Sequence, residues 1–275
     1  MTIEGAGTRG GGVAGLRRVT APAGIVRVDA AEMVVECGAA TPVDELLAEL
    51  ETVGQTIAVP DSGTIGGALA TGHSAITRLG HGAIRDVLLM AHYVGADGAL
   101  VKAGGPTVKN VSGFDLCRLL VGSVGTLGFL GTVLLRTRPI APCVRWFSSD
   151  RDPVELLDAV YRPVSMLWNG RTTWVRLDGV ELDVEDAARH HQLVPVDGPP
   201  PLPPHRWSLR PGELPTLGEH DGAFVAEIGV GIVHRDRPRH VVEASDAIVG
   251  LHQRIAAAFD PTDRLNRGRS ALRGA

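Results

Sequence analysis

Residues 64–139 decide the fold, and they read TIGGALATGHSAITRLGHGAIRDVLLMAHYVGADGALVKAGGPTVKNVSGFDLCRLLVGSVGTLGFLGTVLLRTRP. Two apolar runs in this stretch, 87–94 and 100–103, have the composition of buried strands. The Asp97-Gly98 pair between them favours the left-handed conformations of a tight turn. The pattern therefore predicts a hairpin, set among glycine-rich loops.

The uncharged run at 119–135 is long enough to raise the question of a membrane span. Gly122, Gly125, Gly128 and Gly131 recur in it at every third residue. In a helix each of them would cost about 1 kcal/mol relative to alanine. We therefore expect a turn followed by a buried strand, and no membrane span.

The composition of the whole chain excludes several classes of protein. Its 275 residues carry 27 basic and 31 acidic side chains, a net charge of −4, so a nucleic acid or an anionic membrane is not an expected partner. The 3 cysteines are far apart and odd in number, which excludes a disulfide framework and fits a reducing, cytoplasmic compartment. The hydrophobic content of 44% is that of an ordinary globular protein.

Two domains are expected, because 24 of the 35 glycines lie in residues 1–142. Pro139 and Pro142 stop regular structure at the point where the composition changes, so the division is placed there, giving domains 1–142 and 143–275. In the first, 33–37 is an expected strand, and a helix is expected to follow with Thr41 as its cap and Pro42 in its first turn.

The second half predicts a small α+β layer. Its expected strands are 144–147, 173–177 and 224–233, and its expected helices are 153–161, 181–190 and 239–259. The proline-rich run 199–204 is expected to cross the surface in an extended form. The fold class is therefore α+β.

Four glycine-rich clusters could hold phosphate through backbone N–H groups: residues 5–8, 64–72, 104–105 and 122–128. No lysine follows any of them as in a Walker loop, and each alone is more typical of a turn. Three of them, at 5–8, 64–72 and 122–128, follow a recognisable order together with two further motifs: GAGT, TIGG, Arg85-Asp86, KNVSGFD and GSVGTLG. In that order they resemble the FAD-binding domain of the vanillyl-alcohol oxidase / p-cresol methylhydroxylase (PCMH-type) superfamily, and within it the FAD-binding subunits of glycolate oxidases.

The resemblance implies FAD as cofactor and assigns residues to it. GAGT would hold the pyrophosphate, TIGG and the residues after it would lie along the diphosphate and flavin, and the other motifs would complete the site. Small residues suit close backbone approach. The assigned residues are Gly5, Ala6, Gly7, Thr8, Thr64, Ile65, Gly66, Gly67, Ala70, Thr71, Gly72, His73, Gly82, Arg85, Asp86, Gly122, Ser123, Gly125, Thr126 and Gly128.

The chain departs from the family pattern in three places. The family has a βαβ unit before its phosphate loop, whereas GAGT begins here at residue 5, so the domain is expected to be shortened at its N-terminus. His73 replaces a small or amide residue. In the C-terminal tail, Asn266-Arg267-Gly268 stands where the family has Asn-Pro-Gly.

The resemblance also predicts how the flavin is held. Relatives with covalent FAD carry a histidine in the phosphate loop, and GAGT has none, so noncovalent FAD is expected. The paired histidines and carboxylate of metal-assisted hydroxy-acid dehydrogenases are missing, with His234 alone in GVGIVH, and no metal is expected. His190 and His191 are interpreted as a solvated helix end.

Oxidation of a 2-hydroxy acid needs a cation for the carboxylate and a base for the hydroxyl. Arg206 and Arg210, four residues apart around Trp207, could provide the cation, although a surface segment explains them equally well. His234 is a candidate base, but a structural role is the more common one for such a histidine. Lys109 of KNVSGFD is a further candidate.

The leading hypothesis is an FAD-dependent oxidoreductase that resembles a glycolate oxidase FAD-binding subunit, with a reduced cap domain. It would transfer hydride from a small 2-hydroxy acid to FAD. The resemblance implies a second flavoprotein subunit and an iron–sulfur subunit as partners. The alternative is a non-catalytic partner subunit of the same fold that binds FAD weakly or not at all. A nucleotide-binding transferase ranks last.

Overall fold

The computed structural model describes residues 1–3, 13–106, 115–218, 222–239 and 244–273. The chain forms two compact units, each built from separated segments. The first unit contains Met1–Ala75, Ala83–Ile140 and Val242–Ala275, and the second contains Ile76–Gly82 and Ala141–Val241. Antiparallel sheets with separate helices confirm the α+β class.

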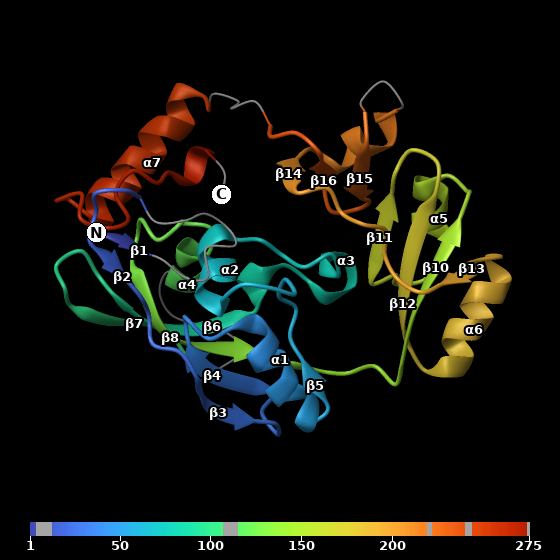
Figure 1. The fold of residues 1–275 in the computed structure, drawn as a ribbon, viewed down its shortest axis with the longest axis horizontal. Helices are drawn as coiled ribbons and strands as arrows, with labels where there is room; N and C mark the ends of the chain where they lie inside the picture. Colours follow the sequence, from blue (N-terminus) through green and yellow to red (C-terminus); the bar gives the residue numbers. More distant parts are fainter. Residues whose placement is uncertain (4–12, 107–114, 219–221, 240–243, 274–275) are drawn as a thin grey trace. The chain divides into compact units, whose positions relative to one another are not determined.

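The first unit is built on a five-stranded antiparallel sheet (Figure 1). Its strands, in spatial order, are β3 (Ile25–Asp29), β4 (Val34–Gly38), β8 (Phe129–Arg136), β6 (Leu88–Val94) and β7 (Leu100–Gly104). The hairpin of β6 and β7 is the expected one, and Gly98 at its turn has a φ of 84°. Strand β8 confirms the expected turn and buried strand after the glycine run. No helix of the described residues is long and apolar enough to cross a membrane.

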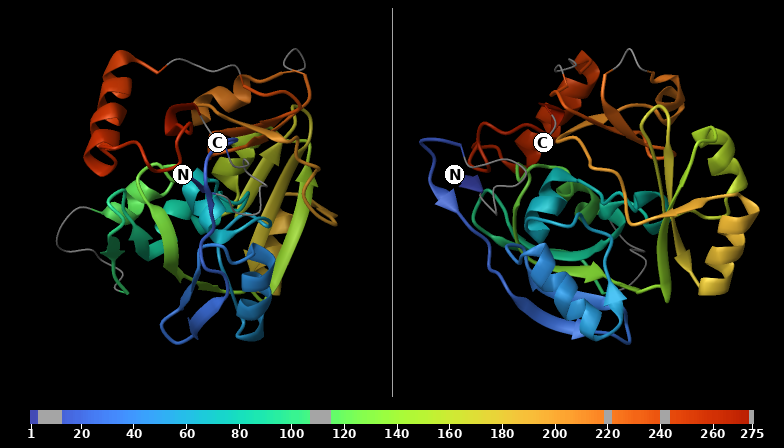
Figure 2. Two further views of the ribbon diagram at one scale, coloured as in Figure 1. Left: turned by 60° about the vertical axis from the view of Figure 1, so that its left-hand side comes forward. Right: turned by 45° about the vertical axis from the view of Figure 1, so that its right-hand side comes forward.

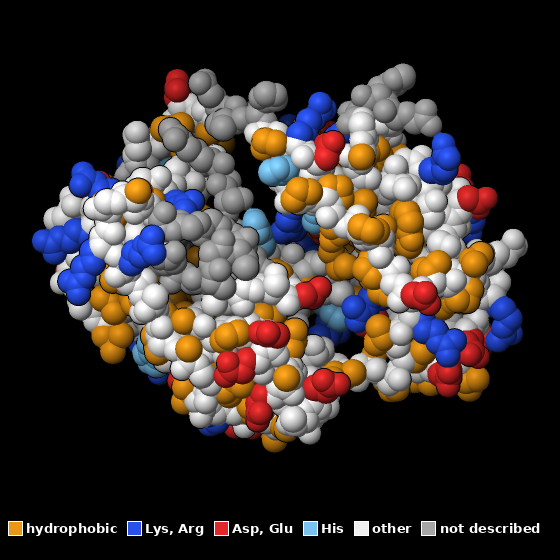
Figure 3. Space-filling model, in the orientation of Figure 1, with side chains coloured by type: hydrophobic (Ala, Val, Ile, Leu, Met, Phe, Trp, Pro, Cys, Tyr) orange, Lys and Arg blue, Asp and Glu red, His pale blue; other side chains and the backbone are white. Residues whose placement is uncertain are grey.

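Four helices accompany this sheet: α1 (Val43–Thr52), α2 (Ile65–Thr71), α4 (Leu116–Leu120) and α7 (Asp246–Phe259). Short elements complete the unit: β1 (Thr2–Ile3), β2 (Arg18–Val19), β5 (Gln55–Thr56), β9 (Arg138–Pro139), and the 3-10 turns η1 (Ile84–Asp86) and η4 (Ala271–Arg273). Helix α1 buries Val43, Leu46 and Leu50, one apolar stripe at helical spacing. Its acidic side chains face outward, over the lower part of the unit in Figure 3.

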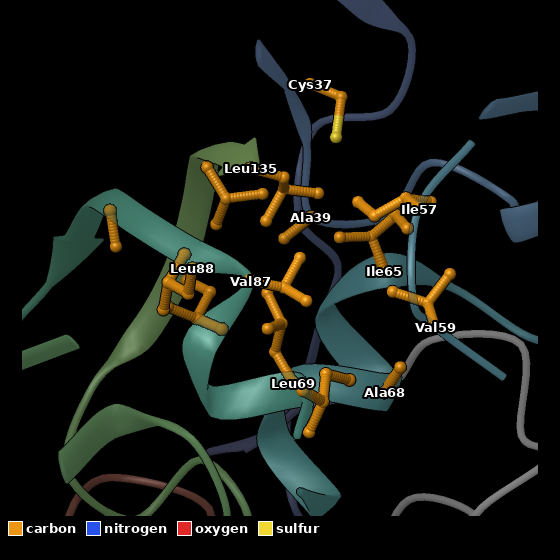
Figure 4. Close-up of a cluster of buried hydrophobic side chains, with 14 of the residues drawn as sticks. Cys37, Ala39, Ile57, Val59, Ile65, Ala68, Leu69, Val87, Leu88 and Leu135 are labelled. Carbon is orange, nitrogen blue, oxygen red and sulfur yellow. The ribbon is translucent and has the colours of Figure 1, made fainter. Parts of the chain in front are cut away.

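The core of the first unit gathers around α2. Ile65, Ala68 and Leu69 of this helix are fully buried, and they pack with side chains from β4, β6 and β8 (Figure 4). At about 25 cal/mol per Å² of apolar area, burial of this kind is the main stabilising term. Helix α7 adds Ile255 and Phe259 to the same cluster.

The second unit is a seven-stranded sheet covered by helices on one face (Figure 2). Its strands, in spatial order, are β13 (Val194–Val196), β10 (Cys143–Ser149), β12 (Thr173–Gly179), β11 (Ser165–Trp168), β15 (Phe224–Glu227), β16 (Ile232–Arg235) and β14 (His205–Ser208). Helices α5 (Pro153–Ala159) and α6 (Glu181–His190) bury Leu156 and Val184 against it. The other helical elements are α3 (Arg78–His81) and the 3-10 helix η2 (Pro211–Thr216).

Three local expectations were wrong. Residues 224–233 form β15 and the start of β16 rather than one strand, because Gly229 and Gly231 take φ of 78° and 89° and turn the chain into a hairpin. Helix α7 begins at Asp246, not at residue 239. The cap of α1 is Pro42, and the Thr41 hydroxyl instead bonds the backbone of Gly24.

The compact units differ from the expected boundary at 142/143 in two places. The tail Val242–Ala275 groups with the first unit, where it supplies core side chains through α7. The segment Ile76–Gly82 groups with the second unit. Gly80 explains its attachment, because its N–H donates to Val164 O at 3.1 Å and a Cβ there would lie 2.7 Å from Val164 Cα.

An ion-pair cluster also holds this segment to the second unit. Asp178 on β12 receives two bonds from Arg176, at 2.7 and 3.0 Å, and lies 3.2 Å from His81 Nε2. Burial, the largest single influence, raises the pKa of Asp178, but the hydrogen bonds from His81 and Arg176 outweigh it and hold that pKa below its ordinary value. The ionised carboxylate is therefore the form that the fold stabilises.

Asp178→Asn should destabilise the second unit and make it less sensitive to acid. A carboxylate with a lowered pKa stabilises the fold above its unfolded value of about 3.9, and this contribution is lost as the pH falls through the folded value. At pH 7 we expect a loss of about 2 kcal/mol, the size of a charged hydrogen bond. Tryptophan fluorescence during urea unfolding reports this unit, because Trp146, Trp168, Trp174 and Trp207 all lie in it.

The matched control is Asp186→Asn, which removes an exposed ion pair with Arg189 in the same unit. It should leave the urea midpoint unchanged, since exposed pairs contribute little. Equal effects of the two substitutions, or an unchanged acid dependence in Asp178→Asn, would contradict this account.

Candidate functional site

The TIGG motif forms the start of α2, and its geometry explains its residues. Thr64 caps the helix, with its hydroxyl accepting a bond from the Gly67 N–H at 3.2 Å. The Gly66 N–H donates to Ala39 O at 2.6 Å, and a Cβ on Gly66 would lie 2.7 Å from that oxygen. Position 66 therefore admits only glycine, and α2 is fixed against the chain that follows β4.

The GSVGTLG motif lies beside the end of α2, although about fifty residues separate the two in sequence. Gly122 N–H donates to Leu69 O at 2.9 Å, and Val124 N–H donates to Ala70 O at 2.8 Å. Gly72 ends the helix with a φ of 68°, and a Cβ on it would lie 3.2 Å from Gly122 Cα. Two of the expected cofactor segments are thus joined through their backbones.

Asn266 in the C-terminal tail connects three parts of the first unit. Its side chain donates to Val124 O at 2.5 Å and accepts bonds from Ile3 N–H at 3.0 Å and from the Thr2 hydroxyl at 3.2 Å. The residue is 7% exposed and has a φ of 39°, a conformation that asparagine tolerates. The first strand, the GSVGTLG turn and the tail therefore share one amide group.

Arg118 connects two further motifs. It donates to Asp86 at 3.0 Å, beside Arg85, and lies 3.2 Å from Asp115, the last residue of KNVSGFD and the cap of α4. Asp86 and Arg85 are exposed. Asp115 and Asp86 therefore share the guanidinium of Arg118.

The glycines of these motifs divide into two kinds. Gly125 and Gly128 make room for neighbours, because a Cβ would lie 2.8 Å from Ile3 Cδ1 in the first case and 2.5 Å from the Tyr93 ring in the second. Gly82 and Gly122 instead have φ of 87° and 80°, and a Cβ on either would meet nothing within 4 Å. Of these four glycines, only Gly82 and Gly122 have open space where a side chain would lie.

The hydroxyl groups expected at the cofactor bond to the backbone. Thr71 donates to Gly67 O at 2.9 Å, Ser123 to Leu120 O at 2.8 Å and Thr126 to Ser123 O at 2.7 Å. They stabilise the turns through these bonds. His73 is half-buried at the end of the TIGG segment. Gly5, Ala6, Gly7, Thr8 and Lys109 lie outside the described residues.

The described part of this site fits an anionic dinucleotide in two respects. Gly122 has open space where a side chain would lie, although its N–H is already bonded to Leu69 O. Neither 64–73 nor 122–128 carries an acidic side chain, which would repel a diphosphate. The chemistry of the two segments is therefore compatible with close approach of a phosphate-linked cofactor.

A second polar cluster lies in the second unit, on neighbouring strands. Arg206 on β14 is the cross-strand partner of His234 on β16, and β15 on the other side of β16 carries Glu227. His234 Nε2 lies 2.8 Å from Glu227 Oε1, and Arg206 donates to the same oxygen at 3.4 Å. Sequence reasoning identified Arg206 and His234 but missed Glu227. Glu227 lies seven residues before His234, with Gly229 and Gly231 between them. This spacing brings the two side chains together only when residues 228–231 form the turn of a hairpin, which the sequence analysis did not predict.

The remaining expected residues lie elsewhere. Arg210 is exposed and follows β14, with its backbone N–H bonded to Glu213. His190 and His191 form the end of α6, with ring centroids 4.7 Å apart. Within the described ranges, no group of three or more His, Cys, Asp or Glu side chains could hold a metal ion.

Asn266→Ala should lower the free energy of unfolding of the first unit by about 2 kcal/mol, because it leaves half-buried backbone groups of Ile3 and Val124 without partners. Circular dichroism during urea unfolding measures this loss, while the tryptophan signal of the second unit should shift less. Asn169→Ala is the matched control, since Asn169 bonds two N–H groups of an exposed turn. A loss no greater than that of the control would show that the Asn266 amide does not hold the three segments.

Comparison with known proteins shows what part of the chain is similar to. Residues 2–104 match the family model of the FAD binding domain. "Glycolate oxidase subunit GlcE" of Escherichia coli (strain K12) is 32% identical over 179 residues, which are 60% of this chain and 50% of that protein. "D-lactate dehydrogenase" of Archaeoglobus fulgidus is 34% identical over 119 residues, 42% of this chain and 26% of that protein. The chain therefore spans half or less of these relatives.

Solved structures show the same fold at low identity. Alkyldihydroxyacetonephosphate synthase superposes with a TM-score of 0.68 and 13% identity, over 98% of this chain and 71% of that one. The matched residues 2–104 include the TIGG helix and the hairpin of β6 and β7. Residues 2–104 are therefore similar to FAD-binding domains, and FAD is the cofactor of the chain.

Proposed function

We propose that this chain is an oxidoreductase that transfers hydride from a small 2-hydroxy acid to noncovalently bound FAD. The observation that carries the proposal is the cluster of Arg206, His234 and Glu227 in the second unit. Within the described residues, Arg206 Nε and Glu227 Oε2 are buried and have no hydrogen-bond partner. Such atoms are rare in folded proteins and suit a polar ligand. The names of the relatives, a glycolate oxidase subunit and D-lactate dehydrogenases, support the substrate class.

Arg206 and His234 would have complementary roles in this reaction. The Arg206 guanidinium is planar and suits a carboxylate, so it would bind and orient the acid group. His234 would accept the proton of the hydroxyl as the carbinol carbon is oxidised. Bound FAD supplies the hydride acceptor. Arg210 and Lys109 have no role in this proposal, because Arg210 is exposed and Lys109 lies outside the described residues.

The electrons are proposed to leave to another protein, with a second flavoprotein subunit and an iron–sulfur subunit as the candidates. The chain's own buried cysteines are poor cluster ligands, because ligation requires thiolates. Burial raises the pKa of Cys37 to about 12 and that of Cys117 to about 11. A cytoplasmic location remains a prediction.

The purified chain should show flavin absorption bands that are released on heat denaturation, as noncovalent FAD requires. Under anaerobic conditions, D-lactate or glycolate should bleach these bands. Arg206→Lys should raise the KM for the acid by about tenfold or more, because an ammonium cannot replace a planar two-point contact. Arg189→Lys, an exposed change on α6, is the control and should behave as wild type.

Two results would contradict the proposal. A chain that binds FAD but is not bleached by any small 2-hydroxy acid would remove the substrate class. A chain that neither carries nor takes up FAD would favour the non-catalytic partner subunit instead.

A further inference from the structure

The proposed function gives roles to Arg206 and His234, and the contact between His234 and Glu227 indicates a role for Glu227 as well. The two side chains lie on one face of the hairpin of β15 and β16, because their neighbours Ala226 and Val233 belong to the core on the other face. Glu227 is 1% exposed and His234 is 5% exposed. A carboxylate at this depth needs charged or hydrogen-bonding partners.

We infer that Glu227 is a positioning residue for His234. An ionised carboxylate only accepts hydrogen bonds, so the 2.8 Å contact requires His234 to donate from Nε2. The neutral ring then carries its lone pair on Nδ1, and that nitrogen is the one able to accept a proton. Glu227 thereby fixes both the tautomer and the orientation of the ring.

The charge of Glu227 gives it a second effect on the same step. When His234 accepts a proton it becomes a cation, and a carboxylate at 2.8 Å stabilises it strongly where water is excluded. Arg206, at 3.4 Å from the same oxygen, balances the carboxylate while the ring is neutral. The hairpin therefore holds a base together with the counter-ion that its protonated form requires.

The inference rests on the proposed function, in which the substrate is a 2-hydroxy acid. In that reaction the carbinol C–H bond would break and its electron pair would leave as hydride, for which oxidised FAD would supply the acceptor. The O–H proton goes to His234 Nδ1, and the C–O bond becomes a double bond. Two electrons and one proton thus leave the substrate as hydride, and the second proton remains on the imidazole next to Glu227.

The tautomer can be measured without any turnover. Long-range proton–nitrogen correlation NMR on the FAD-loaded chain with nitrogen-labelled histidine should show one ring with the proton on Nε2, and the signal should disappear in His234→Gln. In Glu227→Gln, which keeps the shape of the side chain, this ring should lose its single tautomer. A wild-type His234 that carries its proton on Nδ1, or a pattern unchanged in Glu227→Gln, would overturn the inference.

Kinetics provide the second test. Glu227→Gln should lower kcat by about 100-fold and change KM much less, because the carboxylate acts mainly on the proton transfer. Its flavin absorbance should match that of wild type, and its melting temperature should fall as for Asp178→Asn, because a buried charged hydrogen bond is weakened. Glu185→Gln, an exposed change in the same unit, is the matched control and should leave kcat unchanged.

The outcomes distinguish this inference from the proposed function. If wild type oxidises no 2-hydroxy acid, the proposed function fails together with the catalytic part of the inference, while the NMR measurement still decides the Glu227–His234 contact. If wild type is active and Glu227→Gln keeps its kcat, only the inference fails. Loss of all activity in Glu227→Gln with most activity kept in His234→Gln would make Glu227 itself the base, and would also overturn it.

Discussion

The first unit depends most on the hydrogen bonds of the Asn266 side-chain amide. It bonds the first strand and the GSVGTLG turn at once, and that turn is bonded in its backbone to the end of α2. A buried amide with all of these bonds made is rigid, because breaking any one leaves a polar group unpaired in the core. The cofactor segments are therefore held in place by a residue from a distant part of the chain.

The second unit also has polar side chains held by hydrogen bonds, but its two clusters differ in how completely those bonds are made. Its helix-covered face is apolar and fully packed, whereas the strands carry their charged groups on the opposite face, at Glu227, His234, Arg176 and Asp178. Asp178 has both carboxylate oxygens bonded, but Glu227 retains one buried oxygen without a partner among the described residues. The cluster around Asp178 stabilises the fold, whereas the cluster around Glu227 can form a further hydrogen bond with a ligand.

The sequence was most informative where short-range rules operate. The β6–β7 hairpin, helix α6 and the strand after the glycine run follow from turn chemistry and periodicity, and the ordered motifs predicted the FAD-binding domain. It was least informative about groups that meet only in three dimensions. Gly128 could not be separated from Gly122 without Tyr93 in place, and Glu227 becomes visible only when residues 228–231 form a turn. Asn266 was noted in the tail, but its bonds to Thr2 and Ile3 span the whole chain.

The discontinuous first unit has a consequence for synthesis of the protein. Its core includes Ile255 and Phe259, which emerge from the ribosome after every residue of the second unit. The first unit therefore cannot complete its core until α7 has been synthesised. All strands of the second unit's sheet, in contrast, are available by residue 235. Vectorial synthesis reverses the order suggested by the sequence: the unit that begins first is finished last.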